Sequence, residues 1–282
     1  MTLRPATPTD LPAILEITRL SLEEHAQAQF TYPNRSRYPA DFVTAMDETP
    51  RKKLAESPPL SYNLVIEDPG SGKVVAWGFW RRNAGVEFTS KIAKYKELDA
   101  AKYNHSGNNN DNNIGGKADG KDVQVDFNPA ASRARMQLCD RCVIRDTLAF
   151  FTQPHWYLSQ LMVHPEQKRK GYGRLLTLWG MRRAREEGFP AFLTASPQGE
   201  RLYTSLGWRD IGSRSFPKLE EMSEEDRRAE EEMFGKETLE EHFSIAPPRI
   251  MKWGNGEEDY AGLDKYGDSA DVTLASFEAE TN

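Results

Sequence analysis

The chain has 282 residues, of which 38% are hydrophobic and 28% charged, with a formal net charge of −6 and a pI of about 5.6. This acidic balance disfavours nucleic acid or an anionic membrane as the main partner, because both bind basic surfaces. No apolar stretch is long enough to cross a bilayer, and the N-terminal residues lack the pattern of a signal peptide. We therefore expect a soluble, cytoplasmic protein.

The first half of the chain shows alternating strand and helix patterns. Apolar alternation and helical spacing define the elements, and prolines and glycines separate them. Residues 61–67 and 74–80 flank a Gly-rich turn and predict a hairpin. The other elements predicted here are a strand at 3–6 and helices at 10–26, 39–46 and 51–56.

Residues 84–150 differ from their surroundings. They predict helices at 88–103 and 130–150, separated by an Asn/Gly-rich loop at 104–121 that is too polar to bury. The second helix carries the two cysteines of the chain, Cys139 and Cys142, spaced as C-x-x-C. A zinc site needs four ligands and a redox pair needs a β-α-β context, and this region offers neither. We interpret the cysteines as reduced thiols and expect no metal.

The C-terminal half predicts a regular strand and helix succession. The elements are strands at 156–163, 191–195, 208–215 and 248–253, with a helix from the glycines near 171 to Gly188. Residues 217–242 are highly charged and are interpreted as a solvated helix or flap. Residues 254–282 are interpreted as an acidic, disordered tail.

Residues 156–176 carry the strongest functional signal. A buried strand and a polar turn lead into a helix that begins at Gly171 and Gly173. Glycines let a ligand approach the backbone, and the first N–H groups of a helix have no partners of their own. The positive end of the helix dipole adds to this attraction for anions. The sequence therefore predicts a site for a phosphate-bearing ligand, surrounded by the basic side chains of Lys168, Arg169, Lys170 and Arg174.

The spacing excludes two common phosphate-binding motifs. A dinucleotide fingerprint requires a third glycine where Leu176 stands, and a P-loop requires Gly-Lys-Ser/Thr. The stretch instead resembles motif A of the GNAT superfamily of acyl-CoA N-acyltransferases, V-x-P-x-x-[QR]-x-x-G-x-[GA]. The matching residues are Val163, Pro165, Gly171 and Gly173, and Lys168 replaces the usual Gln or Arg.

A second segment, residues 192–208, resembles motif B of the same superfamily. It matches on Leu202, Tyr203, Leu206, Gly207 and Trp208, and Ser196 stands where many members carry Asn. The resemblance is strong over 155–216 and weak over 2–83. It implies an α/β GNAT fold: a mixed, mostly antiparallel sheet of six or seven strands, with helices on both faces and a split near the two motifs. A single domain would span 1–253, with an insertion at about 84–150.

The resemblance also implies acetyl-CoA or coenzyme A as co-substrate, with its pyrophosphate on the main-chain N–H groups of the loop. Tyr203 matches the tyrosine that faces the sulfur and can protonate the leaving thiolate. Backbone N–H groups near Met162 would stabilise the thioester oxygen. The candidate cofactor-binding residues are Met162, Val163, Lys168, Arg169, Lys170, Gly171, Tyr172, Gly173, Arg174 and Ser196.

The general base is not assigned by the sequence. Tyr157 and Ser159 occupy the strand positions where many relatives carry a carboxylate, so Ser159 is a candidate catalytic residue through a water relay. In the family the region near 27–58 covers the acceptor site. Its aromatic residues are therefore candidate pocket walls, with plain packing an equal alternative: Phe30, Tyr32, Tyr38 and Phe42.

The function expected from these observations is transfer of an acetyl or short acyl group from coenzyme A to a primary amine of a small molecule. Three alternatives stay open: a protein or peptide N-acetyltransferase, a non-catalytic CoA-binding protein, and a GNAT-fold enzyme with different chemistry. The missing strand carboxylate favours the second of these. The pattern does not determine the acceptor or the oligomeric state.

Overall fold

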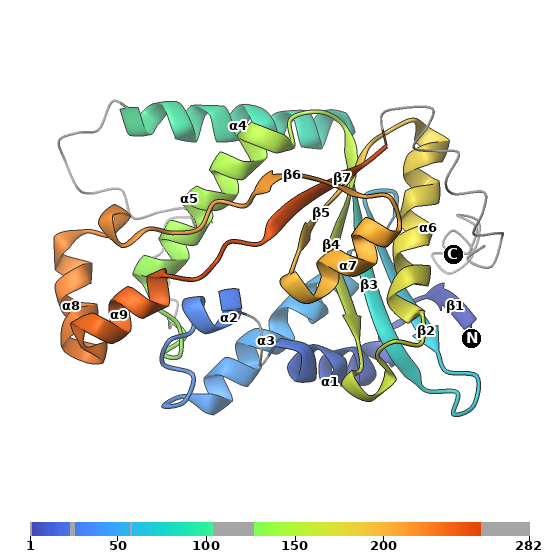
Figure 1. The fold of residues 1–282 in the computed structure, drawn as a ribbon, viewed down its shortest axis with the longest axis horizontal. Helices are drawn as coiled ribbons and strands as arrows, with labels where there is room; N and C mark the ends of the chain where they lie inside the picture. Colours follow the sequence, from blue (N-terminus) through green and yellow to red (C-terminus); the bar gives the residue numbers. More distant parts are fainter. Residues whose placement is uncertain (1, 23–25, 57, 104–126, 255–282) are drawn as a thin grey trace, which may run out of the picture.

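The structure is a computed structural model that describes residues 2–22, 26–56, 58–103 and 127–254. A seven-stranded sheet runs through it in the order β1-β2-β3-β4-β5-β7-β6 (Figure 1). Only β4 and β5 pair in parallel, so the predicted mixed and mostly antiparallel sheet is confirmed. The strands are β1 (Thr2–Pro5), β2 (Ser61–Glu67), β3 (Val74–Asn83), β4 (His155–Val163), β5 (Ala191–Ala195), β6 (Arg209–Ser213) and β7 (Arg249–Trp253).

The helices follow most of the predicted succession, but the short α2 was not predicted and one further correction is needed. The two short helices expected at 39–46 and 51–56 form one continuous helix, α3, which has Pro50 in its interior. Packing of α3 against α1, including the Arg19–Asp47 ion pair, outweighs the backbone hydrogen bond that proline cannot make. The helices are α1 (Leu11–Leu22), α2 (Ala26–Thr31), α3 (Pro39–Leu54), α4 (Gly85–Tyr103), α5 (Arg133–Phe150), α6 (Tyr172–Glu187), α7 (Pro197–Ser205), α8 (Glu224–Phe234) and α9 (Lys236–Phe243).

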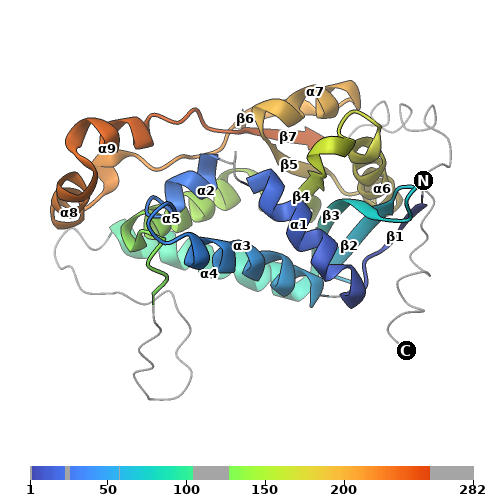
Figure 2. The same ribbon diagram turned by 90° about the horizontal axis from the view of Figure 1, so that it is seen from below.

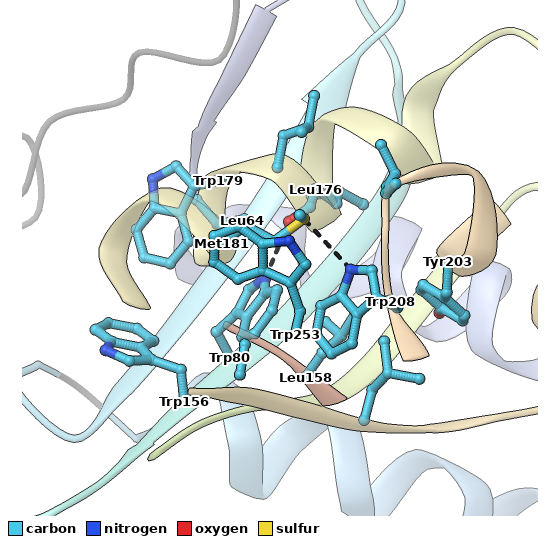
Figure 3. Close-up of a cluster of buried hydrophobic side chains, with 14 of the residues drawn as sticks. Leu64, Trp80, Trp156, Leu158, Leu176, Trp179, Met181, Tyr203, Trp208 and Trp253 are labelled. Atoms are coloured by element: carbon cyan, nitrogen blue, oxygen red, sulfur yellow. Dashed lines mark hydrogen bonds between the residues drawn. The ribbon is translucent and has the colours of Figure 1, made fainter. Parts of the chain in front are cut away.

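The larger core lies between the sheet and α6. It is rich in tryptophan, and Figure 3 shows Trp80, Trp156 and Trp179 in one cluster with Leu176. The indole of Trp80 donates a hydrogen bond to the Leu176 carbonyl over 2.9 Å. Gly180 makes room for the same ring, because a Cβ at this position would overlap its atoms. The close approach of α6 to β3 therefore depends on a glycine opposite a tryptophan.

A smaller core covers the opposite face of the sheet. Ile14 and Ile17 of α1 pack there against Trp77 and Phe79 of β3 and Met162 of β4. Figure 2 shows α1 and α3 on one side of the strands and α7 on the other. The prediction of helices on both faces is thus confirmed. Within the described ranges, no helix combines the length and the apolar character needed to cross a membrane.

A second group of helices (α2, α4, α5, α8 and α9) lies beyond the sheet, away from α6 (Figure 1). Its centre is Arg135 of α5, whose side chain is fully buried and pairs with Glu230 of α8 at 2.7 Å. Its guanidinium also donates to the Phe30 carbonyl and contacts His242 Nδ1. The interpretation of 217–242 as a solvated helix fits the largely exposed side chains of α8 and α9, but this ion pair anchors the segment to α5, so it is not a free flap.

The inserted segment is partly described. Its two predicted helices correspond to α4 and α5, and Cys139 and Cys142 are free thiols on α5. The Asn/Gly-rich loop at 104–121 and residues 255–282 of the tail lie outside the described residues. The predicted boundaries of a single domain with an insertion at 84–150 stay a prediction.

Candidate active site

The sheet splits between β4 and β5. These strands pair in parallel from Trp156 and Ala191 to Leu158 and Leu193, and β4 then continues alone on this side to Val163. A bulge stands at the same point, because the pairing with β3 steps from Gln160 to Leu158 and leaves Ser159 as the extra residue. Bulges of this kind re-aim side chains and occur often beside active sites.

The backbone of β4 presents hydrogen-bond donors to the split. The His164 N–H bonds to the Val75 carbonyl over 2.9 Å. Because N–H groups of successive residues in an antiparallel pair alternate in direction, that of Met162 also points to β3. Those of Leu161 and Val163 point the other way, into the split. The N–H donors that the sequence predicts near Met162 are therefore those of its neighbours, Leu161 and Val163. The Met162 side chain itself lies in the smaller core.

The loop before α6 fits a phosphate group. Gly171 has φ of 90°, and a Cβ built on it would meet no protein atom within 4 Å, so the loop is open at this point. The first backbone bond of the helix runs from the Leu175 N–H to the Gly171 carbonyl. The N–H groups of Tyr172 and Gly173 precede it in the first turn, where an α-helix offers them no acceptor. They are placed to bind an anion.

The side chains of this loop have different surroundings. Lys168, Arg169 and Lys170 are exposed, and Lys170 donates to the Gln167 side chain. Arg174 of α6 is also exposed. The ring of Tyr172 instead belongs to the larger core, and its hydroxyl donates to Asp68 over 2.9 Å. Tyr172 can therefore contribute its backbone N–H to a ligand, while its side chain fixes the helix to the β2–β3 turn.

Gly173 joins the two sequence motifs in space. A Cβ on it would lie 3.2 Å from Leu202 of α7 and 3.3 Å from Leu161 of β4. The segment resembling motif B is thus packed directly on the segment resembling motif A. Ser196 begins α7 as its N-cap, accepting a hydrogen bond from the Gly199 N–H. The sequence placed Ser196 among the cofactor residues, and in the structure its hydroxyl caps a helix at the edge of the site.

Tyr203 lies on α7 with 7% of its surface exposed, in edge contact with Trp208 (Figure 3). Burial raises the pKa of its phenol above the ordinary value, and the neighbouring Tyr157 adds to this effect. The hydroxyl is therefore protonated at neutral pH and can donate. Tyr157 in turn is held by Thr194 of β5, with 2.9 Å between their hydroxyl oxygens.

A cavity of about 380 Å³ opens beside the split, on the side of the bulge. Tyr157, Ser159 and Gln160 of β4 form one wall, and α4 and α5 form another. From the helices come Phe88, Lys91, Val143, Asp146 and Thr147, and Phe151 follows α5. Of the aromatic residues expected near 30–42, Tyr32 lines a second cavity beside Met162. Phe30 is instead a core residue around Arg135.

Two polar pairs fix the cavity walls. His155 is buried, and burial lowers its pKa to about 4, so the ring is neutral at physiological pH. Its Nδ1 lies 2.7 Å from the Gln153 carbonyl, and its Nε2 accepts from the Asn83 side chain. Asp146 accepts a hydrogen bond from the Ser215 N–H, and its second oxygen lies 3.4 Å from Arg214 Nε. It is the carboxylate of the cavity wall.

Ser159 has a charged neighbour that the sequence did not indicate. Lys53, at the C-terminal end of α3, donates from Nζ to the Ser159 hydroxyl over 2.9 Å. Desolvation and the nearby Arg81 lower the pKa of Lys53 to about 7, while Glu56 acts in the opposite direction. Lys53 therefore titrates near physiological pH, beside the strand bulge at the split.

The sequence also missed the contribution of α4 and α5 to the cavity. The only sequence signal was their position, an insertion directly before the strand that carries motif A. Among the described residues, no group of three or more His, Cys, Asp or Glu side chains could hold a metal ion.

A comparison with known protein families finds a match in the part of the chain that forms this site. Residues 134–208 match the model of the acetyltransferase (GNAT) family. These residues belong to the GNAT family. The match begins within α5, includes β4, the loop before α6, and α7, and ends at Trp208, so it contains both segments identified from the sequence. No curated protein matches the chain by sequence.

Three solved structures illustrate the likeness at the level of the whole chain. A Corynebacterium glutamicum structure described as histone acetyltransferase HPA2 and related acetyltransferase shows 17% identity and a TM-score of 0.48, covering 89% of this chain and 94% of its own. The Drosophila melanogaster polyamine N-acetyltransferase shows 14% identity and a TM-score of 0.49, covering 89% and 97%. The PaiA N-acetyltransferase of Thermoplasma acidophilum, in complex with coenzyme A, shows 10% identity and a TM-score of 0.43, covering 90% and 98%. Values this low indicate nothing about the substrate.

Proposed function

We propose that the protein transfers an acetyl or short acyl group from coenzyme A to the primary amine of a small molecule. The observation that carries this proposal is the split between β4 and β5: the loop before α6 follows β4, and both strands line the 380 Å³ cavity. One side of the split suits a phosphate-bearing carrier, and the other suits a small acceptor. Acetyl-CoA supplies the activated acyl group as a thioester.

The binding of coenzyme A would rest on the backbone. The N–H groups of Gly171, Tyr172 and Gly173 are positioned for a pyrophosphate, and the exposed Lys168, Arg169 and Lys170 add positive charge. The N–H groups of Leu161 and Val163 are available for the acyl oxygen and for the arm of the carrier. Each of these roles uses main-chain donors, so the replacement of the usual Gln or Arg by Lys168 leaves them intact.

Tyr203 would act as the proton donor for the leaving thiolate. No side chain among the described residues accepts a hydrogen bond from its hydroxyl, and burial keeps the phenol protonated. A positioned acid of this kind contributes about 10²- to 10⁴-fold to a rate. Tyr157 and Thr194 hold the neighbouring wall of the split in place.

A small acceptor is favoured over a protein by the walls of the cavity. A volume of about 380 Å³ falls at the lower end of the range typical of small-molecule sites. Elements from many parts of the chain surround it, among them α4, α5, β3, β4, β5 and the segment after β6. The Asp146 carboxylate offers an acceptor for a cationic amine, and the aromatic side chains of Phe88, Phe151 and Tyr157 offer apolar contact.

The test is calorimetric titration of the protein with acetyl-CoA, followed by a free-thiol release assay with a panel of alkylamines, arylalkylamines, amino acids and short peptides. Binding with thiol release on one class of small amine is the expected result. Release on peptides alone would favour the protein or peptide N-acetyltransferase. Binding with no release on any amine would favour the non-catalytic CoA-binding protein, and no binding would overturn the proposal.

A further inference from the structure

We infer that Ser159 and Lys53 together form the proton-accepting pair of this site, with Ser159 contacting the amine and Lys53 receiving the proton through it. The inference rests on the proposed function and supplies the base that the sequence does not show. It is carried by the position of the pair: a serine on the strand bulge at the split is hydrogen-bonded to a lysine that forms no ion pair with a carboxylate of the described residues.

Ser159 faces the cavity, and Lys53 stands behind it. The serine is the extra residue of the bulge in β4, and its side chain lines the cavity wall between Tyr157 and Gln160. Lys53 is not among the residues that line the cavity, and its Nζ donates to the Ser159 hydroxyl over 2.9 Å. Ser159 therefore links the cavity wall to Lys53 by a hydrogen bond.

Several contacts fix the lysine in this position. The Asn63 side chain of β2 donates to the Lys53 carbonyl over 2.6 Å, and it accepts from the buried indole of Trp77. The Lys53 Nζ lies 4.8 Å from the centre of the Phe79 ring. The end of α3 is thereby tied to β2, and the half-buried lysine side chain packs over Phe79 of β3.

Burial and the neighbouring Arg81 oppose the protonated form of Lys53, while Glu56 favours it. Arg81 of β3 brings a like charge, and the carboxylate of Glu56 is occupied by Arg81 at 2.6 and 2.7 Å and by the Ser61 hydroxyl. Asn63 and Phe79, from β2 and β3, and Ser159 of β4 are neutral. Among the described residues, no carboxylate forms an ion pair with Lys53. Burial beside a cation is the situation that brings a lysine into its neutral form near pH 7.

The proton transfer balances with these two groups alone. As the amine nitrogen bonds to the acyl carbon, its N–H bond breaks and an O–H bond forms at Ser159. The original Ser159 O–H bond breaks at the same time, and an N–H bond forms at the neutral Lys53. Lys53 becomes a cation and returns the proton to water before the next cycle. Because Lys53 acts through Ser159, it is a positioning residue for this transfer.

The first experiment measures the titration of Lys53 in the free protein. Competitive labelling with acetic anhydride at a series of pH values, read out by peptide mass spectrometry, gives a midpoint for each lysine. Lys52 is the matched control, since it is the next residue in α3, is exposed and pairs with Glu48. The expected midpoint is about 7 for Lys53, against the value of about 10 that lysine has in model peptides. Equal midpoints would overturn the inference.

The second experiment measures the pH dependence of kcat/KM with acetyl-CoA and an amine from the panel that releases thiol. Lys53→Met and Ser159→Ala are expected to lower kcat/KM by about 10²-fold or more and to remove the limb near pH 7. Lys53→Arg keeps a long side chain that can donate to Ser159 but stays protonated and cannot accept a proton, so it should be as impaired as Lys53→Met. Lys52→Met should behave as the unaltered protein.

The variants separate a chemical role from a structural one. A structural lysine would be rescued by arginine, so a Lys53→Arg variant with the unaltered rate and pH profile would overturn the inference. Acetyl-CoA affinity, measured by calorimetry, should stay within about twofold in every variant, because the anion-binding loop is untouched. Turnover with an ordinary labelling midpoint at Lys53 would overturn this inference alone. Thiol release with no amine would overturn the proposed function and the inference with it.

Discussion

Gly171 and Gly188 provide an internal test of the anion-binding loop. They stand at the two ends of α6 with φ values of 90° and 67°, and a Cβ on either meets no protein atom within 4 Å. Replacing either glycine by valine therefore imposes backbone strain without a steric clash. Only Gly171 lies where the backbone would contact a phosphate. The pair of variants separates the cost of strain from the loss of a binding site.

The expected magnitudes follow from these positions. A left-handed conformation costs a side-chain-bearing residue about 1–2 kcal/mol, so both variants should lose stability by this amount or somewhat more, since valine is β-branched. A hydrogen bond from a backbone N–H to a charged group is worth about 1.5–3 kcal/mol. Loss of one such bond at Gly171 would weaken acetyl-CoA binding by about 10- to 150-fold.

Two measurements decide the matter. Urea unfolding should show similar losses of stability for Gly171→Val and Gly188→Val. Calorimetric titration with acetyl-CoA should show weaker binding for Gly171→Val alone, with Gly188→Val close to the unaltered protein. If both variants bind acetyl-CoA equally well, the carrier is not held by the loop before α6, and the reasoning fails.

Three other predictions use the core and the site. Gly180→Ala should destabilise the fold by about 1–3 kcal/mol in urea unfolding, because the new Cβ overlaps the Trp80 ring and outweighs the roughly 1 kcal/mol gain in helix propensity; an unchanged or raised stability would contradict the packing. Tyr203→Phe should lower turnover by about 10²- to 10⁴-fold with acetyl-CoA affinity little changed, and an unchanged rate would remove the phenol from the chemistry. Burial lowers the pKa of His155 to about 4. As the pH falls, this histidine is therefore protonated in the unfolded chain at a higher pH than in the folded protein. The free energy of unfolding should fall as pH drops from about 6.5 towards 4, by about 3 kcal/mol from this residue, and His155→Gln should flatten that slope; equal slopes would contradict the assignment.

The parts of the site that the sequence predicts are those encoded locally. Gly171 and Gly173 predict a sharp backbone turn at the start of a helix, and Pro165 predicts the turn before it. Strand alternation and helix spacing likewise predict most of the sheet. These features are determined by residues that are close together in the sequence, so the local sequence is sufficient to predict them.

The parts that the sequence does not predict depend on distant contacts. Lys53 follows two other basic residues at the end of a helix, the usual appearance of a solvated stretch. Its burial arises only when β4, far along the chain, brings Ser159 to it. Arg135 is similar, because its partner Glu230 stands 95 residues away in a segment whose charge suggested exposure. Pairing a charge across such a separation requires the fold itself.

The position of β7 has a consequence for how the chain matures on the ribosome. β7 is the last strand of the sheet to be synthesised, yet it lies between β5 and β6, and β6 pairs with no other strand in the described part of the chain. Until residues 249–253 have left the ribosome, the nascent chain exposes the edge of β5 and leaves β6 unpaired. Open edges of this kind invite association with other chains. We expect slow translation through this last segment to increase the dependence of the protein on chaperones.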